Sequence, residues 1–339
     1  MTIGSLTTPA PPPAKRPVPR VIPNSVDRSD RAFLWSARGV GIFVLVLIAC
    51  VGLFLGYQSI PTLRHYGWHF FTETQWNPEL DKIGIAAVLV GTVEVALVAM
   101  TVAFPLALLT AIFISDYSPR WLKGWLVSGV DLMAAVPSII YGFWGFYLLE
   151  PRAVGVARWL SQYLGWIPIF HVDTDANAPI WHQPSYLGSV FIAGLAVSMM
   201  AIPLACAVMR AVFDQAPIGE REAAMALGGT RWGVVRKVVL PFGKGGIIGG
   251  SMLALGRALG ETAAVLIILD VTYTIKFRVL EAGGQTTSAL IAGLFPDSTK
   301  GQLSALLAAG FVLFLITIVV NGLAATIIAR SRSGVGTDA

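Results

Sequence analysis

The chain of 339 residues is 55% hydrophobic and 13% charged, carries a formal net charge of +5, and has a mean hydropathy of +0.71. A helix that crosses hydrocarbon needs roughly 20 apolar residues in a row, and the chain contains several such runs. This composition excludes a water-soluble protein. We therefore predict an all-α integral membrane protein.

The first 31 residues differ from the rest of the chain, because they are rich in Pro, Ser and Arg and nearly free of large apolar side chains. Such a segment cannot bury enough apolar surface to fold, so residues 1–31 are predicted to form a disordered tail. The segment is too long and too rich in proline for the charged start of a signal peptide.

Hydropathy predicts six membrane-spanning helices within a domain that covers residues 32–330, followed by a short tail at 331–339. The apolar runs are 40–57, 86–114, 125–149, 187–209, 247–269 and 306–328. Pro105 and Pro137 are expected to kink the second and third helices, since proline removes a backbone donor and clashes with the preceding turn. An even number of helices places both termini on one side of the membrane.

The distribution of Lys and Arg gives the orientation. Sixteen of the 24 basic residues lie on the side that carries the termini, and seven lie on the opposite side. Positive charge in short loops accumulates on the cytoplasmic face. We therefore predict a multi-pass protein of the bacterial plasma membrane with both termini in the cytoplasm, and we predict that the loop at 210–244 is cytoplasmic too.

Several pairs of glycines are spaced four residues apart within the spans. They are Gly245 and Gly249, Gly246 and Gly250, Gly256 and Gly260, and Gly52 and Gly56. Small residues at this spacing allow helices in membranes to approach closely. We expect these glycines to pack the fifth and first helices against their neighbours.

The loop at 210–244 contains the pattern E-A-A-x3-G-x9-[IV]-x-L-P. Its named positions are Glu222, Ala223, Ala224, Gly228, Val238, Leu240 and Pro241. Glycine is favoured just past the C-terminus of a helix, so a short helix is predicted from Glu220 to Gly228. A second helix is predicted from Thr230 to Leu240, with Pro241 ending it. A helix-turn-helix in a loop is a shape suited to docking.

This pattern, in the last long cytoplasmic loop of a six-span chain, resembles that of the membrane subunits of bacterial ABC importers. Two further stretches, Ala135 to Gly145 and Gly256 to Val265, resemble one permease type of the bacterial phosphate importers. The sister type, PstA, has a related R-A-x-G-E-T stretch that is usually followed by Ala-Pro. In this chain Thr262 is followed by Ala263 and Ala264 instead. The resemblance implies a type I ABC importer permease fold, with a coupling helix between helices 4 and 5.

The resemblance also implies partners: a homologous PstA-like permease, two copies of a PstB-like ATPase, and a PstS-like extracytoplasmic protein that delivers phosphate. ATP and Mg would be bound by the ATPase, and this chain would hold no cofactor and bind no nucleic acid. The residues agree, because a P-loop needs G-x4-G-K-[ST] and the nearest string, around Lys244, has Val238 in place of the first glycine. The chain is therefore predicted to be a transporter subunit without ATPase activity, embedded in membrane lipid.

Arg257 lies ten residues into the fifth predicted span, near the middle of the membrane, and an arginine at a helix centre costs roughly 2.5–3.5 kcal/mol on insertion scales. Glu261 follows four residues later, on the same face if the helix is continuous. We expect the pair to line a substrate pathway, where Arg257 donates to phosphate oxygens and Glu261 balances its charge. The alternative is a pair that neutralises itself and holds the bundle together. Glu261 would also select phosphate, which keeps a proton to donate near neutral pH, over sulfate.

Two other acidic side chains in the spans, Glu94 and Asp131, either pair with Arg257 or pair with each other across helices; alternatively Asp131 reaches water. His65 and His69 have the i, i+4 spacing of a metal pair, but no Asp, Glu or Cys beside them in the sequence completes a site. We predict no metal site and no catalytic residue.

Three alternative functions compete with this one. The first is a permease for another oxyanion, sulfate or molybdate. The second is a membrane signalling subunit that transports nothing, against which the buried charge of Arg257 argues. The third is a membrane-embedded enzyme, which we discount because the spans contain no His-Glu cluster, aspartate pair or Gly-x-Ser-x-Gly nucleophile.

Overall fold

A computed structural model describes residues 28–172 and 186–331, and the chain divides into two parts, residues 1–51 and residues 52–339. The helices are α1 (Arg28–Tyr66), α2 (His69–Thr72), α3 (Ala86–Ile112), α4 (Arg120–Ala135), α5 (Ser138–Trp144), α6 (Glu150–Leu164), α7 (Val190–Phe213), α8 (Ile218–Ala226), α9 (Arg231–Val234), α10 (Leu240–Phe242), α11 (Lys244–Leu259), α12 (Ala263–Ile268), α13 (Thr287–Leu294) and α14 (Lys300–Ser331). Short π-helical turns continue α3, α5 and α9 at Phe113–Tyr117, Gly145–Leu149 and Val235–Val239. Strands β1 (Trp76–Asn77) and β2 (Lys82–Ile83) form a small antiparallel hairpin with Trp76 opposite Ile83. The predicted all-α fold class is confirmed.

Four of the helices, α1, α3, α7 and α14, are long and apolar enough to cross a membrane without interruption. Two further pairs of helical segments pass the same test together but are bent, by 91° after α4 and by 70° before α11. Within residues 28–172 and 186–331 the number of candidate spans is therefore four, or up to six if each bent pair crosses the membrane once. The count of six remains a prediction.

The first helix is longer than the sequence predicted. It begins at Arg28, so residues 28–31 of the predicted disordered tail are helical, and it continues past residue 57 to Tyr66. Charged residues stabilise both ends of α1, because Asp30 in the first turn and Arg64 in the last turn interact favourably with the helix dipole. Residues 1–27 and 332–339, which make up the rest of the two predicted tails, lie outside the described residues.

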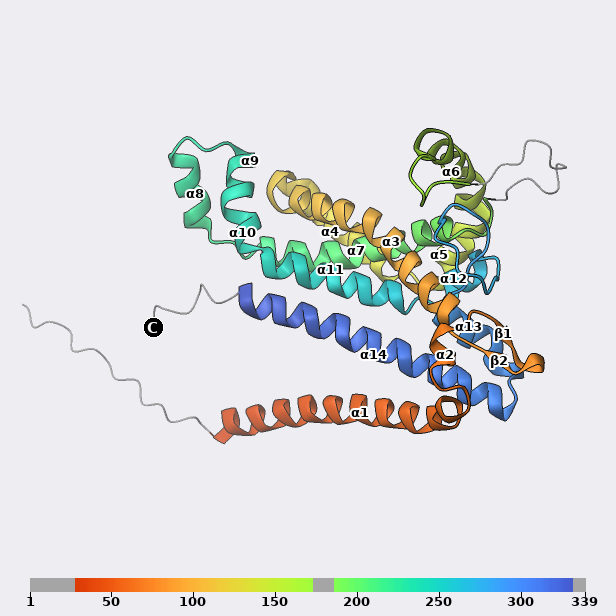
Figure 1. The fold of residues 1–339 in the computed structure, drawn as a ribbon. Helices are drawn as coiled ribbons and strands as arrows, with labels where there is room; N and C mark the ends of the chain where they lie inside the picture. Colours follow the sequence, from red (N-terminus) through yellow and green to blue (C-terminus); the bar gives the residue numbers. More distant parts are fainter. Residues whose placement is uncertain (1–27, 173–185, 332–339) are drawn as a thin grey trace, which may run out of the picture. The chain divides into compact units, whose positions relative to one another are not determined.

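The core of residues 52–339 is built on α3, α7 and α11, which run beside one another (Figure 1). Small side chains make this possible, because Ala99, Ala103, Ala107 and Ala111 recur every four residues along α3 and are completely buried. A stripe of alanines on one helix face lets a neighbouring backbone approach closely. The part of this stripe from Ala103 to Ala111 packs with Ala201, Ala205 and Met209 of α7.

The predicted close packing is found for Gly246 and Gly250 on α11 and for Gly52 on α1, whereas a Cβ at Gly245, Gly249 or Gly256 would make only ordinary contacts at 3.8–3.9 Å. A Cβ atom added at Gly246 would lie 2.6 Å from the Val212 side chain, and one at Gly250 would lie 2.9 Å from the Ala205 carbonyl oxygen, so α11 lies directly on α7. On α1, a Cβ at Gly52 would lie 2.7 Å from the Phe314 ring of α14. These contacts leave no room for a larger side chain at the three glycines.

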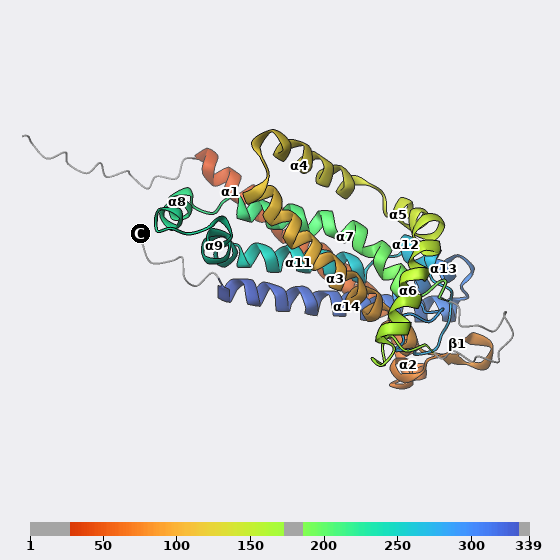
Figure 2. The ribbon, with the colours of Figure 1, turned by 90° about the horizontal axis from the view of Figure 1, so that it is seen from above.

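The third predicted span, 125–149, is broken at Val136 and Pro137. Pro137 takes an extended conformation before α5, and the chain bends by 91° there, which confirms the predicted kink. The Tyr141 hydroxyl donates a hydrogen bond of 2.8 Å to the Met133 carbonyl oxygen and so ties α5 back to α4. Beyond the break, α5 packs on α12, as Figure 2 shows from a second direction.

The fifth predicted span, 247–269, is also broken, which corrects the expectation of a continuous helix. α11 ends at Leu259 and α12 begins at Ala263. Gly260 has a low helix propensity, and the Glu261 carboxylate accepts a hydrogen bond of 3.2 Å from the Ala264 amide instead of continuing the helix. The backbone therefore leaves the helix inside the apolar run.

The contact between α5 and α12 depends on Gly142. A Cβ atom at this position would lie 2.8 Å from the Ala264 Cα, a backbone atom that cannot rotate away. We predict that Gly142→Ala forces the two helices apart and lowers the free energy of unfolding by about 1–3 kcal/mol. Thermal unfolding of the purified protein in detergent measures this effect.

Gly129→Ala is the matched control, because Gly129 lies in α4 and a Cβ there meets no atom within 4 Å. Alanine at an exposed helix position is about 0.5–1 kcal/mol more favourable than glycine, so this variant keeps or raises the unfolding temperature. Equal unfolding temperatures for the two variants would contradict the close contact at Gly142.

Candidate functional site

Arg257 lies in the last turn of α11, where a cation interacts favourably with the helix dipole, and not at the centre of a longer helix as predicted. Its side chain is exposed on the surface of this chain. The guanidinium Nη2 lies 3.9 Å from the Met200 Sδ atom, which cannot balance its charge. Within the described residues Arg257 forms no ion pair with a carboxylate. An uncompensated cation in an apolar segment must face water or another polar partner.

Glu261 does not pair with Arg257, so the predicted ion pair is wrong. The helix break removes the i, i+4 geometry on which that prediction depended. Glu261 is buried, its carboxylate accepts from the Ala264 amide at 3.2 Å, and its carbonyl oxygen accepts from the Ser288 hydroxyl at 2.6 Å. The residue therefore fixes the start of α12 and joins it to α13.

A buried group of hydroxyl side chains supports the far side of the break. The Thr287 amide donates to the Thr92 hydroxyl at 3.0 Å, and the Thr92 hydroxyl donates to the Val88 carbonyl oxygen at 2.6 Å. A Cβ atom at Gly91 would lie 2.3 Å from the Gln285 carbonyl oxygen, so the chain before α13 lies directly on α3. These contacts satisfy backbone groups that a membrane interior leaves without water.

The two other acidic residues of the spans behave differently from the prediction. Asp131 pairs with Arg210 of α7 at 3.6 Å, and its side chain is half-exposed, so it pairs neither with Arg257 nor with Glu94. The Glu94 Oε1 atom is buried on α3 without a hydrogen-bond partner among the described residues.

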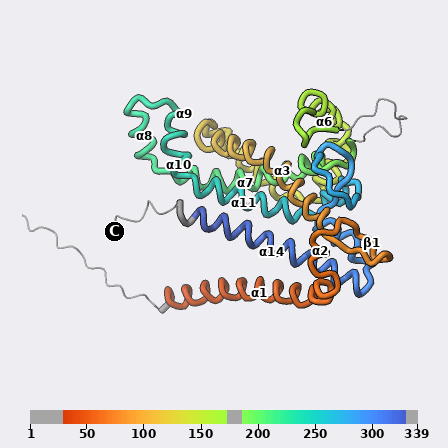
Figure 3. The backbone as a smooth tube through the Cα atoms, viewed as in Figure 1, coloured from red at the N-terminus to blue at the C-terminus, as the bar shows by residue number. Residues whose placement is uncertain are grey.

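The six coupling residues fall in two separate places. Glu222, Ala223 and Ala224 lie in α8, with the first two exposed, and Gly228 follows in a left-handed turn with φ of +83°. The predicted first helix is thus present, although it begins at Ile218. Leu240 and Pro241 lie in α10 instead of ending a helix at Pro241, because the chain stays helical through Phe242 before it turns into α11. Figure 3 shows α8, α9 and α10 at one end of α7 and α11.

The surface around Glu222 is unusually apolar for a loop helix. Ile218, Met225, Leu227 and Trp232 are all exposed, and none of the residues of α8 is buried. Exposed apolar patches that are rimmed by charge mark sites where another protein binds. The geometry of α8 therefore matches a docking helix.

Sequence reasoning missed three buried or half-buried charged residues, two of them at helix ends. Arg221 of α8 pairs with Asp116 at the end of α3, and buried Glu150 accepts a hydrogen bond of 2.6 Å from the Gly188 amide just before α7. Asp116 and Glu150 each close an apolar run, which is the one signal that the sequence offered. Arg221 stands directly beside Glu222, and nothing in the pattern marked it.

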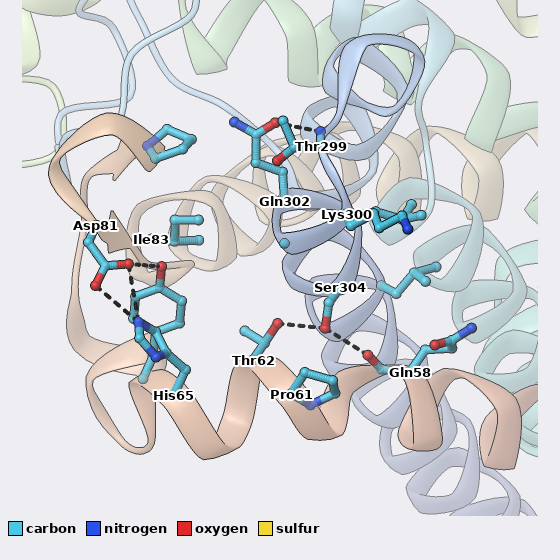
Figure 4. A pocket seen from close by; sticks show the side chains of 15 residues that line it. Gln58, Pro61, Thr62, His65, Asp81, Ile83, Thr299, Lys300, Gln302 and Ser304 are labelled. Atoms are coloured by element: carbon cyan, nitrogen blue, oxygen red, sulfur yellow. Dashed lines mark hydrogen bonds and ion pairs between the residues drawn. The ribbon is translucent and has the colours of Figure 1, made fainter.

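The opposite end of residues 52–339 carries an open cavity of about 570 Å³, shown in Figure 4. Asp81 lies at its edge and accepts hydrogen bonds from the Tyr66 hydroxyl at 2.7 Å and from the His65 ring at 3.0 Å. These two hydrogen bonds, Tyr66 first, lower the pKa of Asp81 from its ordinary value. The structure thus gives His65 a carboxylate partner that its sequence neighbours did not supply. Between residues 28 and 172 and between 186 and 331, no three potential ligands gather as a metal site.

The comparisons with known proteins agree with this arrangement. The family model described as binding-protein-dependent transport system inner membrane component matches residues 84–333. The phosphate transport system permease protein PstC 2 of Mycobacterium tuberculosis is 37% identical over 311 residues, 91% of this chain and 94% of the relative. The phosphate transport system permease protein PstC of Xylella fastidiosa strain Temecula1 is 36% identical over 304 residues, 89% of this chain and 91% of the relative.

The fold is also similar to that of solved transporters. The crystal structure of a bacterial ABC transporter involved in the import of the acidic polysaccharide alginate gives a TM-score of 0.57 at 16% identity, and the match covers 88% of this chain and 96% of that chain. A structure of the MetNI methionine ABC transporter in an inward-facing conformation gives a TM-score of 0.51 at 14% identity, covering 76% of this chain and 99% of that chain. At these identities the likeness concerns the fold alone.

The chain therefore belongs to the family of inner membrane components of binding-protein-dependent transport systems. It is a membrane permease subunit of an ABC importer, a component of a transporter and not an enzyme. The resemblance to the permeases of phosphate importers, predicted from three short motifs, is confirmed across about 90% of the chain.

The hydrogen bond that Glu261 accepts at the start of α12 gives a testable expectation. We predict that Glu261→Gln keeps its thermal stability, because the amide oxygen can accept from the Ala264 amide, whereas Glu261→Leu loses about 1 kcal/mol of unfolding free energy. Thermal unfolding in detergent distinguishes the two variants. Equal destabilisation of both would show that the charge of Glu261, and not its hydrogen bond, stabilises the break.

Proposed function

We propose that this permease conducts inorganic phosphate inward across the plasma membrane. The observation that carries the proposal is Arg257, an exposed guanidinium at a helix break in an apolar segment, which pairs with no carboxylate in the described part of the chain. A planar guanidinium donates two parallel hydrogen bonds to an oxyanion. The names of the PstC relatives support phosphate as that anion.

The helix break gives Arg257 its setting. Irregular backbone at membrane depth is tolerated where it is buried in protein or lines a water-filled cavity, and broken helices commonly form substrate sites in transporters. In this proposal Arg257 faces the pathway between two permease subunits. Glu261 acts as a positioning residue that fixes the start of α12, and direct selection of protonated phosphate by its carboxylate is its second proposed role.

The proposed energy source is an ATPase that docks on α8. The exposed Glu222 and the apolar side chains around it form the contact, and ATP and Mg are bound by the ATPase and not by this chain. As a member of its family the chain works in a system of several components. We propose a PstA-like permease, two PstB-like ATPases and a PstS-like binding protein, with all six spans crossing the membrane and with α8 and both termini in the cytoplasm.

Two other functions are less well supported than phosphate import. A permease for sulfate or molybdate would use the same guanidinium, so Arg257 alone does not separate these oxyanions. A signalling subunit that transports nothing would have no need for an exposed, uncompensated Arg257 in an apolar segment.

The substrate is tested by reconstitution of the complete complex in proteoliposomes, with ATP-dependent uptake of phosphate measured against sulfate and molybdate. We expect uptake of phosphate alone, and uptake of another anion without phosphate would overturn the proposal.

Arg257→Ala should lower phosphate uptake by at least about tenfold, as the loss of a charge-assisted hydrogen bond of about 1.5–3 kcal/mol requires. Arg158→Ala, which removes an exposed arginine elsewhere, is the matched control. If Glu261→Gln transports phosphate normally and sulfate still fails to compete, direct selection by the carboxylate is excluded.

The docking role of α8 is tested by a pair of charge reversals on the same helix. Glu222→Lys should weaken binding of the ATPase to the permease by about tenfold, because it reverses a charge at the centre of the contact. Glu220 lies two residues before Glu222, in the first turn of α8, and therefore points to another side of the helix. Glu220→Lys is expected to change binding by less than about threefold. Binding of the purified ATPase to the detergent-solubilised permease pair measures both, and equal effects would remove Glu222 from the contact.

A further inference from the structure

The Arg221 side chain connects α8 to the ends of two long helices. Its Nη1 atom donates to the Asp116 carboxylate, in the π-helical turn that ends α3, and its Nη2 atom donates to the Phe213 carbonyl oxygen, at the last residue of α7, at 2.5 Å. The side chains of Arg221 and Asp116 are only 18% and 9% exposed. One guanidinium therefore joins three helices.

A second set of contacts adds α4 to this junction. Asp214, the residue after Phe213, accepts from the Lys123 ammonium at 2.8 Å and from the Ser115 hydroxyl at 2.9 Å. Lys123 and Asp214 are each 36% exposed, so this pair is screened by water more than the pair formed by Arg221. The ends of α3, α4 and α7 are thus held together beside α8.

The helix α8 has few other connections to the bundle. It packs mainly on α9 and on the turn Val235–Val239, which belong to the same loop. Among the described residues α8 makes no other side-chain hydrogen bond or ion pair to α3, α4 or α7. A force applied to α8 therefore reaches the end of α3 through Arg221, and it reaches the end of α7 through Arg221 and through the backbone of residues 214–217.

Separating Arg221 from Asp116 would be costly. The Asp116 Oδ2 and Arg221 Nε atoms are buried and have no hydrogen-bond partner among the described residues, so the pair is not fully satisfied even when it is formed. Removal of one partner from a buried ion pair leaves an uncompensated charge in a low dielectric. The three helices should consequently move as one body.

We propose that Arg221, Asp116 and the Phe213 carbonyl form a clamp that converts movement of α8 into movement of α3 and α7. This proposal rests on the proposed docking of the ATPase on α8, and it assigns to Arg221 and Asp116 the role of positioning residues for the transport cycle. The clamp transmits the motion, whereas Glu222 contacts the ATPase.

The test uses the complete reconstituted complex and measures two rates in the same proteoliposomes, ATP hydrolysis and uptake of radiolabelled phosphate. In Asp116→Asn we expect the ATPase to stay bound and to hydrolyse ATP within about twofold of wild type, while phosphate taken up per ATP falls by at least about tenfold. Combining Asp116→Arg with Arg221→Glu should restore uptake per ATP above that of either single variant. A purely structural role would lower both rates together and would leave phosphate taken up per ATP unchanged in the single variants.

Two controls keep the outcome decisive. Lys123→Gln breaks the neighbouring exposed pair and should leave uptake per ATP within about twofold of wild type. Arg221→Lys keeps a cation for Asp116 but loses the planar fork that also reaches Phe213, so it should fold and give an intermediate uptake of phosphate per ATP. This variant still tests the clamp if Asp116→Asn does not assemble. Wild-type uptake per ATP in Arg221→Lys and Asp116→Asn would overturn the clamp. Failure of Glu222→Lys to weaken ATPase binding would instead overturn the docking on which the clamp depends.

Discussion

The interruption of the fifth apolar run between Leu259 and Ala263 is the constraint on which the rest of the structure depends. Backbone that leaves a helix inside a membrane must find its hydrogen bonds in the protein. Glu261 supplies one bond from its side chain and accepts another at its carbonyl oxygen from Ser288. The residues around α12, from Gly142 on one side to Thr287 on the other, serve to hold this irregular segment in place.

Two of the motifs that carried the family resemblance turn out to be one structural unit. The stretch around Gly142 and the stretch around Glu261 are separated by more than 100 residues, yet α5 and α12 are in direct contact. The glycine is required because the Ala264 backbone occupies the place of a side chain. Arg257 sits at the edge of this unit, at the end of α11, where no carboxylate of the described residues pairs with it. A cation presented in this way is available to an anion.

The sequence predicted the apolar helices, the bend at Pro137, the helix of the coupling loop and the family, because hydropathy, proline and fixed motif spacing are local signals. It failed at Glu261, since the i, i+4 rule assumes a continuous helix and Gly260 gave only a weak warning against one. It also placed Arg257 at mid-helix for the same reason. The partners of Asp131, His65 and Arg221 lie on other segments, and sequence distance carries no information about such contacts.

The positions of the two sites suggest how they communicate. α8 lies at one end of α7 and α11, and the break that presents Arg257 lies near the other end of α11. The glycines on α11 press it against α7, so a displacement of the Phe213 end of α7 cannot occur without carrying α11 along. Interiors packed this closely are stiff and transmit strain instead of absorbing it. The clamp at Arg221 and the glycine contacts at Gly246 and Gly250 would then be two successive connections that transmit the same movement. The first connects α8 to α7, and the second connects α7 to the helix that bears the anion-binding arginine.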